Sequence, residues 1–332
     1  MRGSATEQAA VYERLASLRA TAALDRTHPE LTVSLLPWVL SLDASERLPE
    51  IVACGVDLLA GRYAALGLGD VLPTDRVWVG VRSSSEGWGG FHYPNQGDRH
   101  LQMGAIITRY GDLSADSATS PDLVALDLFR SYAHDCLHYG TYRQYRLWGT
   151  KIVRSRYGIN ARTLDGRTYS APDADGTRST RNLGIVMEGA TDREAKRITR
   201  QAAKRGGIVA PKDGPDLYAF RDATDRLSFS DLTTLHDPKV RSRLAQGTVA
   251  DAYLASMGSY ARDVGSRYTA FLREIGRGAA EDLHTLIVRA MVSGSLASLS
   301  GWLDQRHGTG AFTAMFRAAS YRGEEPGNSV NI

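Results

Sequence analysis

Cysteine is scarce in this chain. Only Cys54 and Cys136 occur among the 332 residues, and two cysteines are too few for a disulfide framework. Cys136 lies inside a histidine cluster, but it is two positions away from each histidine, so on a helix its side chain points away from theirs. We therefore expect Cys136 to be a core residue and not a metal ligand.

Long apolar runs and a strong excess of charge are also missing. No stretch reaches the roughly 18 apolar residues that a membrane-spanning helix needs. Charged residues interrupt the first 23 positions, which is not typical of a secretory signal. We expect a cytoplasmic protein with no membrane partner. The 40 basic and 37 acidic residues leave a net charge of +3, which predicts no nucleic-acid partner; the oligomeric state stays open.

What is present is an ordinary globular composition. Hydrophobic residues make up 42% of the chain and charged residues 23%, which is ample for a core. The pattern predicts four consecutive parts. These are an N-terminal helical segment (1–70), a core segment (71–207) that contains the histidine cluster, a helical C-terminal subdomain (208–322) and a disordered tail (323–332).

The first hundred residues are expected to mix helices and strands. Apolar periodicity predicts helices over residues 5–24 and 48–66. Runs rich in β-forming residues predict strands over 76–81 and 101–109.

A well-signalled helix follows. Ser120 is a good N-cap residue, Pro121 suits the first helical position, and Asp122 complements the helix dipole. An apolar stripe then predicts that this helix extends to about Trp148.

The remainder is expected to be strands followed by helices. Strands are predicted over 151–157, 159–164 and 167–170, with a hairpin turn at Asp165-Gly166. Helical patterns follow over 180–204, 249–275, 281–305 and 311–319.

Two histidines four residues apart carry the main chemical signal. They lie in His134-Asp135-Cys136-Leu137-His138, in the second half of the helix that begins at Pro121. Residues at i and i+4 lie on one face of a helix, so both imidazoles can reach one ion. Asp135 projects beside that face and could accept a proton from a metal-bound water.

A second cluster places two carboxylates four residues apart. Glu188 and Asp192 lie in the middle of the helix predicted over 180–204. A catalytic zinc takes three protein ligands and keeps one position open for water. Glu188 is the candidate third ligand beside His134 and His138. Asp192 is the candidate acceptor for the other ring N–H of His134, fixing its tautomer.

This order of motifs resembles the zincin metallopeptidases, specifically the thermolysin-like (gluzincin) branch, over about residues 75–205. The resemblance implies an α+β fold with a small mixed sheet, an active-site helix and a mostly helical C-terminal subdomain. It implies that residues 101–109 form an edge strand that holds an extended peptide or protein substrate. It also implies that His134, His138 and Glu188 bind Zn²⁺ and that Asp135 is the general base.

The chain departs from the family pattern at the base, which is Glu in H-E-x-x-H and here is Asp135, one methylene shorter. The family also uses a downstream Tyr or His to stabilise the oxyanion. The candidates for that role, among which the sequence does not choose, are Tyr157, Tyr169, His236 and His284.

Two alternatives remain open. The His134-Asp135 pair also resembles the central dyad of HD-type metal-dependent phosphohydrolases. Those proteins are all-helical and need a further upstream His, whereas here His92 and His100 lie in predicted loop or strand. The other alternative is a non-catalytic scaffold, stabilised by metal or metal-free. The favoured prediction is a zinc-dependent hydrolase, a metalloprotease or another amide hydrolase.

Overall fold

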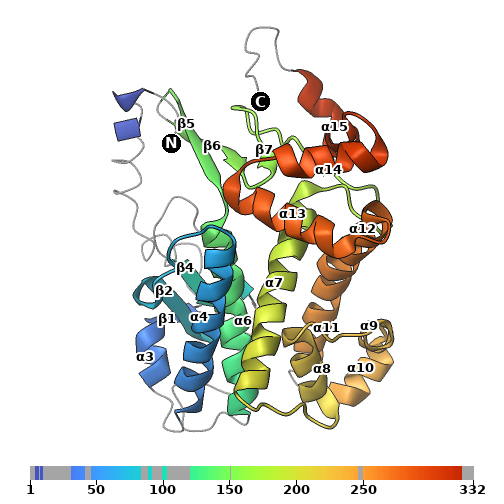
Figure 1. Cartoon of the computed structure of the whole chain (residues 1–332). Coiled ribbons are helices and arrows are strands. Elements are labelled where there is room, and N and C mark those ends of the chain that lie inside the picture. The colour runs from blue at the N-terminus through green and yellow to red at the C-terminus, as the bar shows by residue number, and fades with distance from the viewer. Residues whose placement is uncertain are drawn as a thin grey trace. The chain divides into compact units, whose positions relative to one another are not determined.

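Helices predominate over two small β-sheets in the computed structural model of the chain (Figure 1). The structure describes residues 4–6, 8–9, 31–41, 46–83, 89–91, 99–102, 120–149, 151–245 and 250–323. The mixed α+β class predicted from the sequence is confirmed. None of the helices in these ranges combines the length and the apolar character required to cross a membrane.

The chain forms two compact units, each assembled from stretches that are distant in sequence. Unit 1 holds the described residues within 1–13, 141–190 and 266–332, and unit 2 those within 14–140 and 191–265. The sequence prediction instead divided the chain into consecutive segments. The tail predicted from residue 323 lies outside the described residues apart from Gly323, as does most of the helix predicted over 5–24.

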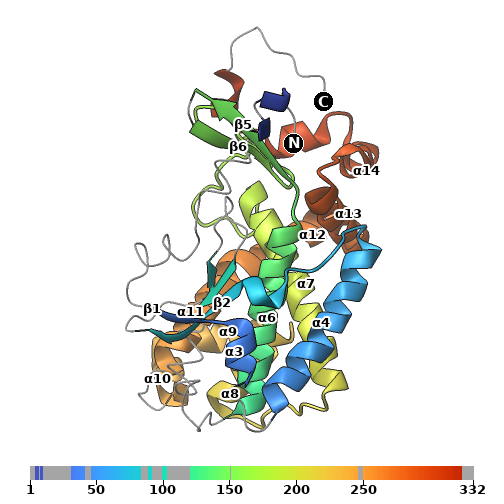
Figure 2. The ribbon, with the colours of Figure 1, turned by 90° about the vertical axis from the view of Figure 1, so that its left-hand side faces the viewer.

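Sheet A belongs to unit 2 and has the strand order β1-β2-β4-β3. β1 (Leu31–Leu35) pairs antiparallel with β2 (Val77–Ser83), β2 pairs parallel with β4 (Arg99–Gln102), and β3 (Gly89–Phe91) pairs antiparallel with β4. The short helix η1 (Thr74–Arg76) leads into β2. Figure 2 shows β1 and β2 beside α3 (Leu36–Ser41) and α6 (Pro121–Gly140).

One prediction about this sheet is wrong. The edge strand expected over 101–109 corresponds to β4, which lies between β2 and β3 and is therefore an interior strand. Among the described strands, β1 and β3 form the two edges because β4 hydrogen-bonds on both sides. Residues 103–109 lie outside the described part of the chain.

The core of unit 2 forms where α4 (Arg47–Ala65) packs on α6. A Cβ on Gly55 would overlap the ring of Phe129, so glycine permits the close approach of the two helices. The Tyr63 hydroxyl donates to the carbonyl oxygen of Cys136. Cys136 is fully buried, which confirms its prediction as a core residue.

α7 (Leu183–Arg205) and four shorter helices follow in unit 2, with the first residues of α7 belonging to unit 1. The shorter helices are α8 (Gly214–Ala223), α9 (Phe229–His236), α10 (Pro238–Ala245) and α11 (Ala250–Tyr260). The sequence pattern did not predict α8, α9 or α10. A capping box between Ser228 and Asp231 starts α9, and the sequence does contain that signal.

Sheet B belongs to unit 1. Its first strand occupies residues that were predicted to form the end of the histidine helix. α6 ends at Gly140 and does not continue to Trp148, because β5 (Arg143–Trp148) pairs antiparallel with β6 (Lys151–Tyr157). β7 (Asn160–Ala161) adds a third, very short strand. The rest of the strands predicted over 159–164 and 167–170 is reduced to two isolated bridges, Arg162 with Thr168 around the turn and Ser170 with Arg317.

The C-terminal helices complete unit 1. They are α12 (Arg267–Gly276), α13 (Ala280–Ser293), α14 (Ala297–His307), α15 (Ala311–Phe316) and the 3₁₀ turn η3 (Ala319–Gly323). Two predicted long helices are interrupted. A π-helical segment, η2 (Ala261–Ser266), separates α11 from α12. Gly294, at a φ of 71°, ends α13 before α14 begins, since glycine adopts the left-handed conformation without strain.

Candidate metal centre

α6 carries both histidines in its last two turns. The backbone N–H groups of Leu123 and Val124 donate to the carbonyl oxygen of Ser120, as expected for a helix that starts there. The face of α6 that carries His134 and His138 is half-buried, in contrast to the fully buried residues around it.

α7 carries the candidate third ligand. The side-chain oxygen of Asn182 accepts hydrogen bonds from the N–H groups of Gly184 and Ile185, which caps the start of this helix. Glu188 follows in the second turn and is half-buried. The next residue is Gly189, where a Cβ would overlap Tyr268. Glycine is therefore needed at this turn of α7 so that α12 can pack closely against it.

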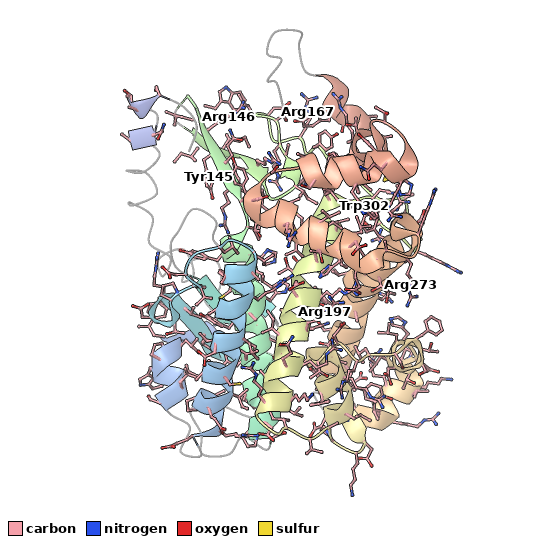
Figure 3. All side chains as sticks on the ribbon, in the orientation of Figure 1. Tyr145, Arg146, Arg167, Arg197, Arg273 and Trp302 are labelled. Carbon is pink, nitrogen blue, oxygen red and sulfur yellow. The ribbon has the colours of Figure 1, made fainter. Side chains whose placement is uncertain are left out.

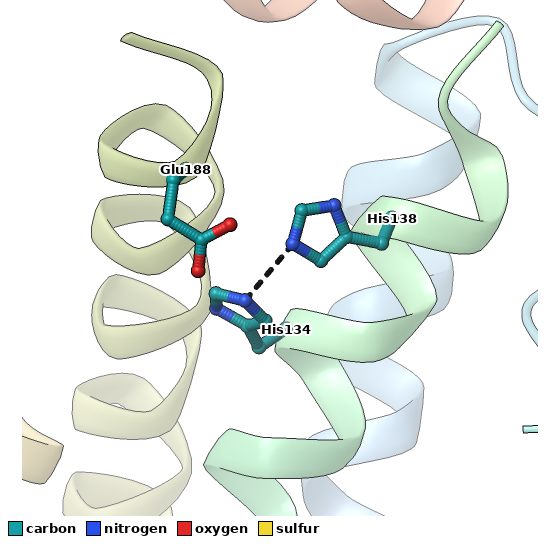
Figure 4. A group of neighbouring side chains, drawn as sticks. All are labelled: His134, His138 and Glu188. Atoms are coloured by element: carbon teal, nitrogen blue, oxygen red, sulfur yellow. Dashed lines mark hydrogen bonds between the residues drawn. The ribbon is translucent and has the colours of Figure 1, made fainter. Parts of the chain in front are cut away.

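His134, His138 and Glu188 point toward one another (Figure 4). The two Nε2 atoms are 3.0 Å apart. The ring centroids are 4.7 Å apart, with an angle of 68° between the ring planes. One ligand atom from each of the three residues lies within 4.8 Å of the other two, and no other such group occurs among the described residues.

This geometry fits a small divalent cation. Zinc binds His nitrogen at about 2.0–2.1 Å and carboxylate oxygen at about 2.0–2.2 Å, so two donors of a tetrahedral site lie about 3.3 Å apart. The Nε2 separation is close to that value, and one ligand atom of Glu188 lies within 4.8 Å of a ligand atom of each histidine. Two imidazole nitrogens at 3.0 Å otherwise require that one of them carries a proton, because two lone pairs repel each other.

Asp135 lies directly after His134 on α6 and is buried, with 3% of its surface exposed. It is not a member of the three-residue group. Burial raises the pKa of the Tyr132 phenol, and the Asp135 carboxylate is one of the charges that raise it further. On a helix, the residue after His134 projects beside the face that carries the two histidines. Its role in proton transfer stays a prediction.

Asp192 lies one turn beyond Glu188 and takes part in a buried network of charges in unit 2. Its carboxylate forms a salt bridge with the Lys196 ammonium at 2.8 Å, and a nitrogen of the Arg130 guanidinium lies 3.9 Å from an oxygen of the same carboxylate. Lys196 also contacts Asp222 at 2.8 Å. Burial alone would lower the pKa of Lys196, but Asp192 and Asp222 outweigh it and raise that pKa above its usual value. The predicted hydrogen bond from His134 to Asp192 stays a prediction.

The four candidates for oxyanion stabilisation have other surroundings. The His284 ring is buried and lies 2.8 Å from the Tyr268 hydroxyl through Nδ1. The Tyr169 hydroxyl donates to Thr313. The guanidinium groups of two arginines lie over the ring of Tyr157, and His236 is exposed at the end of α9. None of the four belongs to the three-residue metal group of the described chain.

The sequence did not predict the buried charge network of Asp192, Lys196, Asp222 and Arg130. The spacing of Asp192 and Lys196, four residues apart on one helix, is the signal that could have predicted the contact between these two. Asp222 and Arg130 come from other helices, so no local pattern identifies them. A depression of about 480 Å³ lies elsewhere in unit 2, lined by residues such as Leu217, Phe220 and Arg226, and contains none of the candidate site residues.

Comparisons of the chain with protein-family models, with curated proteins and with solved structures find no match. The resemblance to the zincins therefore depends on the motif His134-Asp135-x-x-His138 with Glu188 and Asp192.

Proposed function

We propose that this protein is a zinc-dependent hydrolase that acts on a peptide or on another amide. The observation that supports the proposal is the convergence of two imidazoles from α6 and one carboxylate from α7 within 4.8 Å. Two nitrogens and one oxygen are the donor set of the open, catalytic type of zinc site. A zinc ion bound there would supply a Lewis acid and a water molecule of lowered pKa.

The three ligands and Asp135 would have different roles in the reaction. His134 and His138, both neutral, and Glu188, with one negative charge, would leave the site with a net charge of +1 around a divalent ion. A site of that charge would favour binding of a substrate carbonyl oxygen. Asp135 would hold the proton taken from water at its carboxylate oxygen and pass it to the leaving amine. The half-buried position of all three ligands limits the access of bulk water.

Asp135 has a shorter side chain than the glutamate of the family motif, and it is compatible with this proposal if a water molecule relays the proton. A general base must lie within about 2.6–3.2 Å of the proton it takes, directly or through one water. Asp135 reaches less far than a glutamate would, so proton transfer through a bridging water is the route we favour. The Asp135→Glu variant tests this route, because its longer side chain would not need the bridging water.

The HD-type phosphohydrolase is the alternative hypothesis. His134-Asp135 resembles its central dyad, but that class is all-helical, whereas in this chain the strands of sheet A precede α6 and those of sheet B follow it. Purified protein that hydrolyses a nitrophenyl phosphate ester but no peptide would favour this alternative over our proposal.

Metal analysis of the purified full chain tests the ligand set. We expect about one zinc per wild-type chain, the stoichiometry of a single three-ligand site, and almost none in His138→Ala. The control is His236→Ala, which removes an exposed histidine at the end of α9 and should leave the zinc content unchanged. Equal zinc in the wild type and in His138→Ala would refute the assignment.

A further inference from the structure

Sheet B carries a concentration of positive charge that the composition of the whole chain conceals. Residues 141–170 contain one acidic residue, Asp165, and seven basic ones, which are Arg143, Arg146, Lys151, Arg154, Arg156, Arg162 and Arg167. The prediction of no nucleic-acid partner rested on the overall charge of +3. A net charge averaged over a chain does not report such a local excess.

One face of β5 carries an exposed arginine and an exposed tryptophan. Tyr145 is buried, whereas Arg146 is exposed and Trp148 is 50% exposed. Residues two apart on a strand share a face, so Arg146 and Trp148 project together. The pairing of Tyr142 with Gly158 continues the ladder beyond β5 and adds Tyr142 to the same face.

The neighbouring strand β6 contributes Arg156 to this face, at the end away from Trp148. Gln144 lies opposite Arg156, and residues directly opposite each other share a face. The Arg156 guanidinium lies 5.5 Å from the centroid of the Tyr142 ring. The Tyr142 ring packs on Gly294 and one terminal nitrogen of Arg156 is buried, so the exposed part of this face is the end that carries Arg146 and Trp148.

A register shift in β6 separates a second stack from this face. The pairing of β5 with β6 shifts between Gln144 and Tyr145, so Ser155 is an extra residue in β6. The guanidinium groups of Arg143 and Arg154 lie over the Tyr157 ring at 5.5 and 4.5 Å. Both faces of the sheet thus contribute to its positive potential.

We propose that the face of β5 that carries Arg146 and Trp148 binds single-stranded nucleic acid. Aromatic rings and guanidinium planes stack on bases of any sequence, and the guanidinium charges attract the phosphates. Trp148 would stack on a base, and Arg146, two residues away on the same face, would contact a neighbouring phosphate. The proposal uses only residues of unit 1 and is independent of the zinc site.

Two other polyanionic partners fit less well. Insertion into a membrane needs several apolar side chains on the binding face, but Trp148 is the one large apolar side chain of the β5–β6 hairpin that is exposed. An acidic peptide needs the charges but has no use for exposed stacking surfaces. The combination of an exposed tryptophan with arginines favours bases.

Binding of a fluorescein-labelled 20-mer of thymidine to the full chain tests the proposal by fluorescence anisotropy. We expect affinity that falls as salt rises from 50 to 200 mM, because phosphate contacts release counterions. The double variant Arg146→Glu/Trp148→Ala should weaken binding about tenfold or more, since it removes one charge contact and one stacking platform. Both side chains are exposed, so the fold should persist.

The chain offers a matched control on α14, where the Arg306 guanidinium lies 4.4 Å from the centroid of the Trp302 ring (Figure 3 labels Trp302, and Tyr145 and Arg146 on β5). Arg306→Glu/Trp302→Ala makes the same chemical change away from sheet B and should alter binding less than twofold. The proposal is overturned if the wild type does not bind at 50 mM salt or if the control loses as much affinity. Tighter binding to a poly-glutamate peptide or to phosphatidylserine vesicles would also overturn it.

Discussion

At the scale of single residues, unit 2 shows how buried charges are tolerated. Lys196 is 6% exposed and has two carboxylates, Asp192 and Asp222, each at 2.8 Å. An isolated ammonium in such a place would lose its proton, whereas these carboxylates raise its pKa and keep it charged. Along α7, Asp192 is four residues from Glu188 and four residues from Lys196. The surroundings of one residue, and not its type, decide its charge.

Asp135 allows a prediction at the same scale. We expect Asp135→Asn to lower the turnover of a fluorogenic peptide by about 10²–10⁴-fold, because an amide cannot accept the proton. Its zinc content should stay at the wild-type level, since Asp135 lies outside the ligand group. Turnover numbers and metal analysis on the same samples separate the two effects.

Asp135→Glu is the matched variant for that measurement. It restores the carboxylate at the reach of the family motif, so we expect it to retain the activity that Asp135→Asn loses. A non-catalytic scaffold makes the opposite prediction, because there Asp135→Asn would leave every measurable property of the protein unchanged.

At the scale of elements, local signals located most helices but not where they end. The sequence predicted a helix over 180–204, and α7 spans Leu183–Arg205. It also predicted that the histidine helix reaches Trp148, whereas α6 ends at Gly140. The stretch from Arg143 to Trp148 has an apolar pattern compatible with either structure. The partner strand β6 decides in favour of a strand because its hydrogen bonds are long-range.

The contact between α4 and α6 gives a prediction for an element. A Cβ at Gly55 would overlap Phe129, while the space around Gly61 on the same helix is open. We expect Gly55→Ala to lower the free energy of unfolding by about 1–3 kcal/mol through overpacking. Gly61→Ala, the control, should raise it by about 0.5–1 kcal/mol because alanine favours the helix. Urea unfolding followed by circular dichroism measures both; equal effects would contradict the packing described for these helices.

At the scale of the whole molecule, each unit is assembled from separate stretches of chain. Residues 141–190 interrupt the sequence of unit 2, and the chain returns to unit 1 after residue 265. A prediction that proceeds along the chain produces consecutive segments and cannot anticipate this arrangement. The α+β class was still predictable, because it depends on the kinds of elements and not on which of them meet.

Metal binding gives a prediction for the entire chain. A ligand that binds only the folded state stabilises it, by about 2.7 kcal/mol at a concentration one hundred times its dissociation constant. We therefore expect a chelator to lower the melting temperature of the wild type by several degrees and added zinc to restore it. Differential scanning calorimetry of His138→Ala should show no response to either treatment. If the chelator leaves the melting temperature of the wild type unchanged, the prediction that zinc binds the folded chain is wrong.

The sequence by itself determined what short-range geometry controls. The spacing of His134 and His138 places both imidazoles on one helix face, and their Nε2 atoms lie 3.0 Å apart. Tertiary structure alone decided that Glu188, fifty residues beyond His138, comes within 4.8 Å of that pair, and that Asp192 meets Lys196 and Arg130. The physical reason is that helical periodicity fixes neighbours three or four residues apart, whereas distant residues meet only through the packing of whole elements.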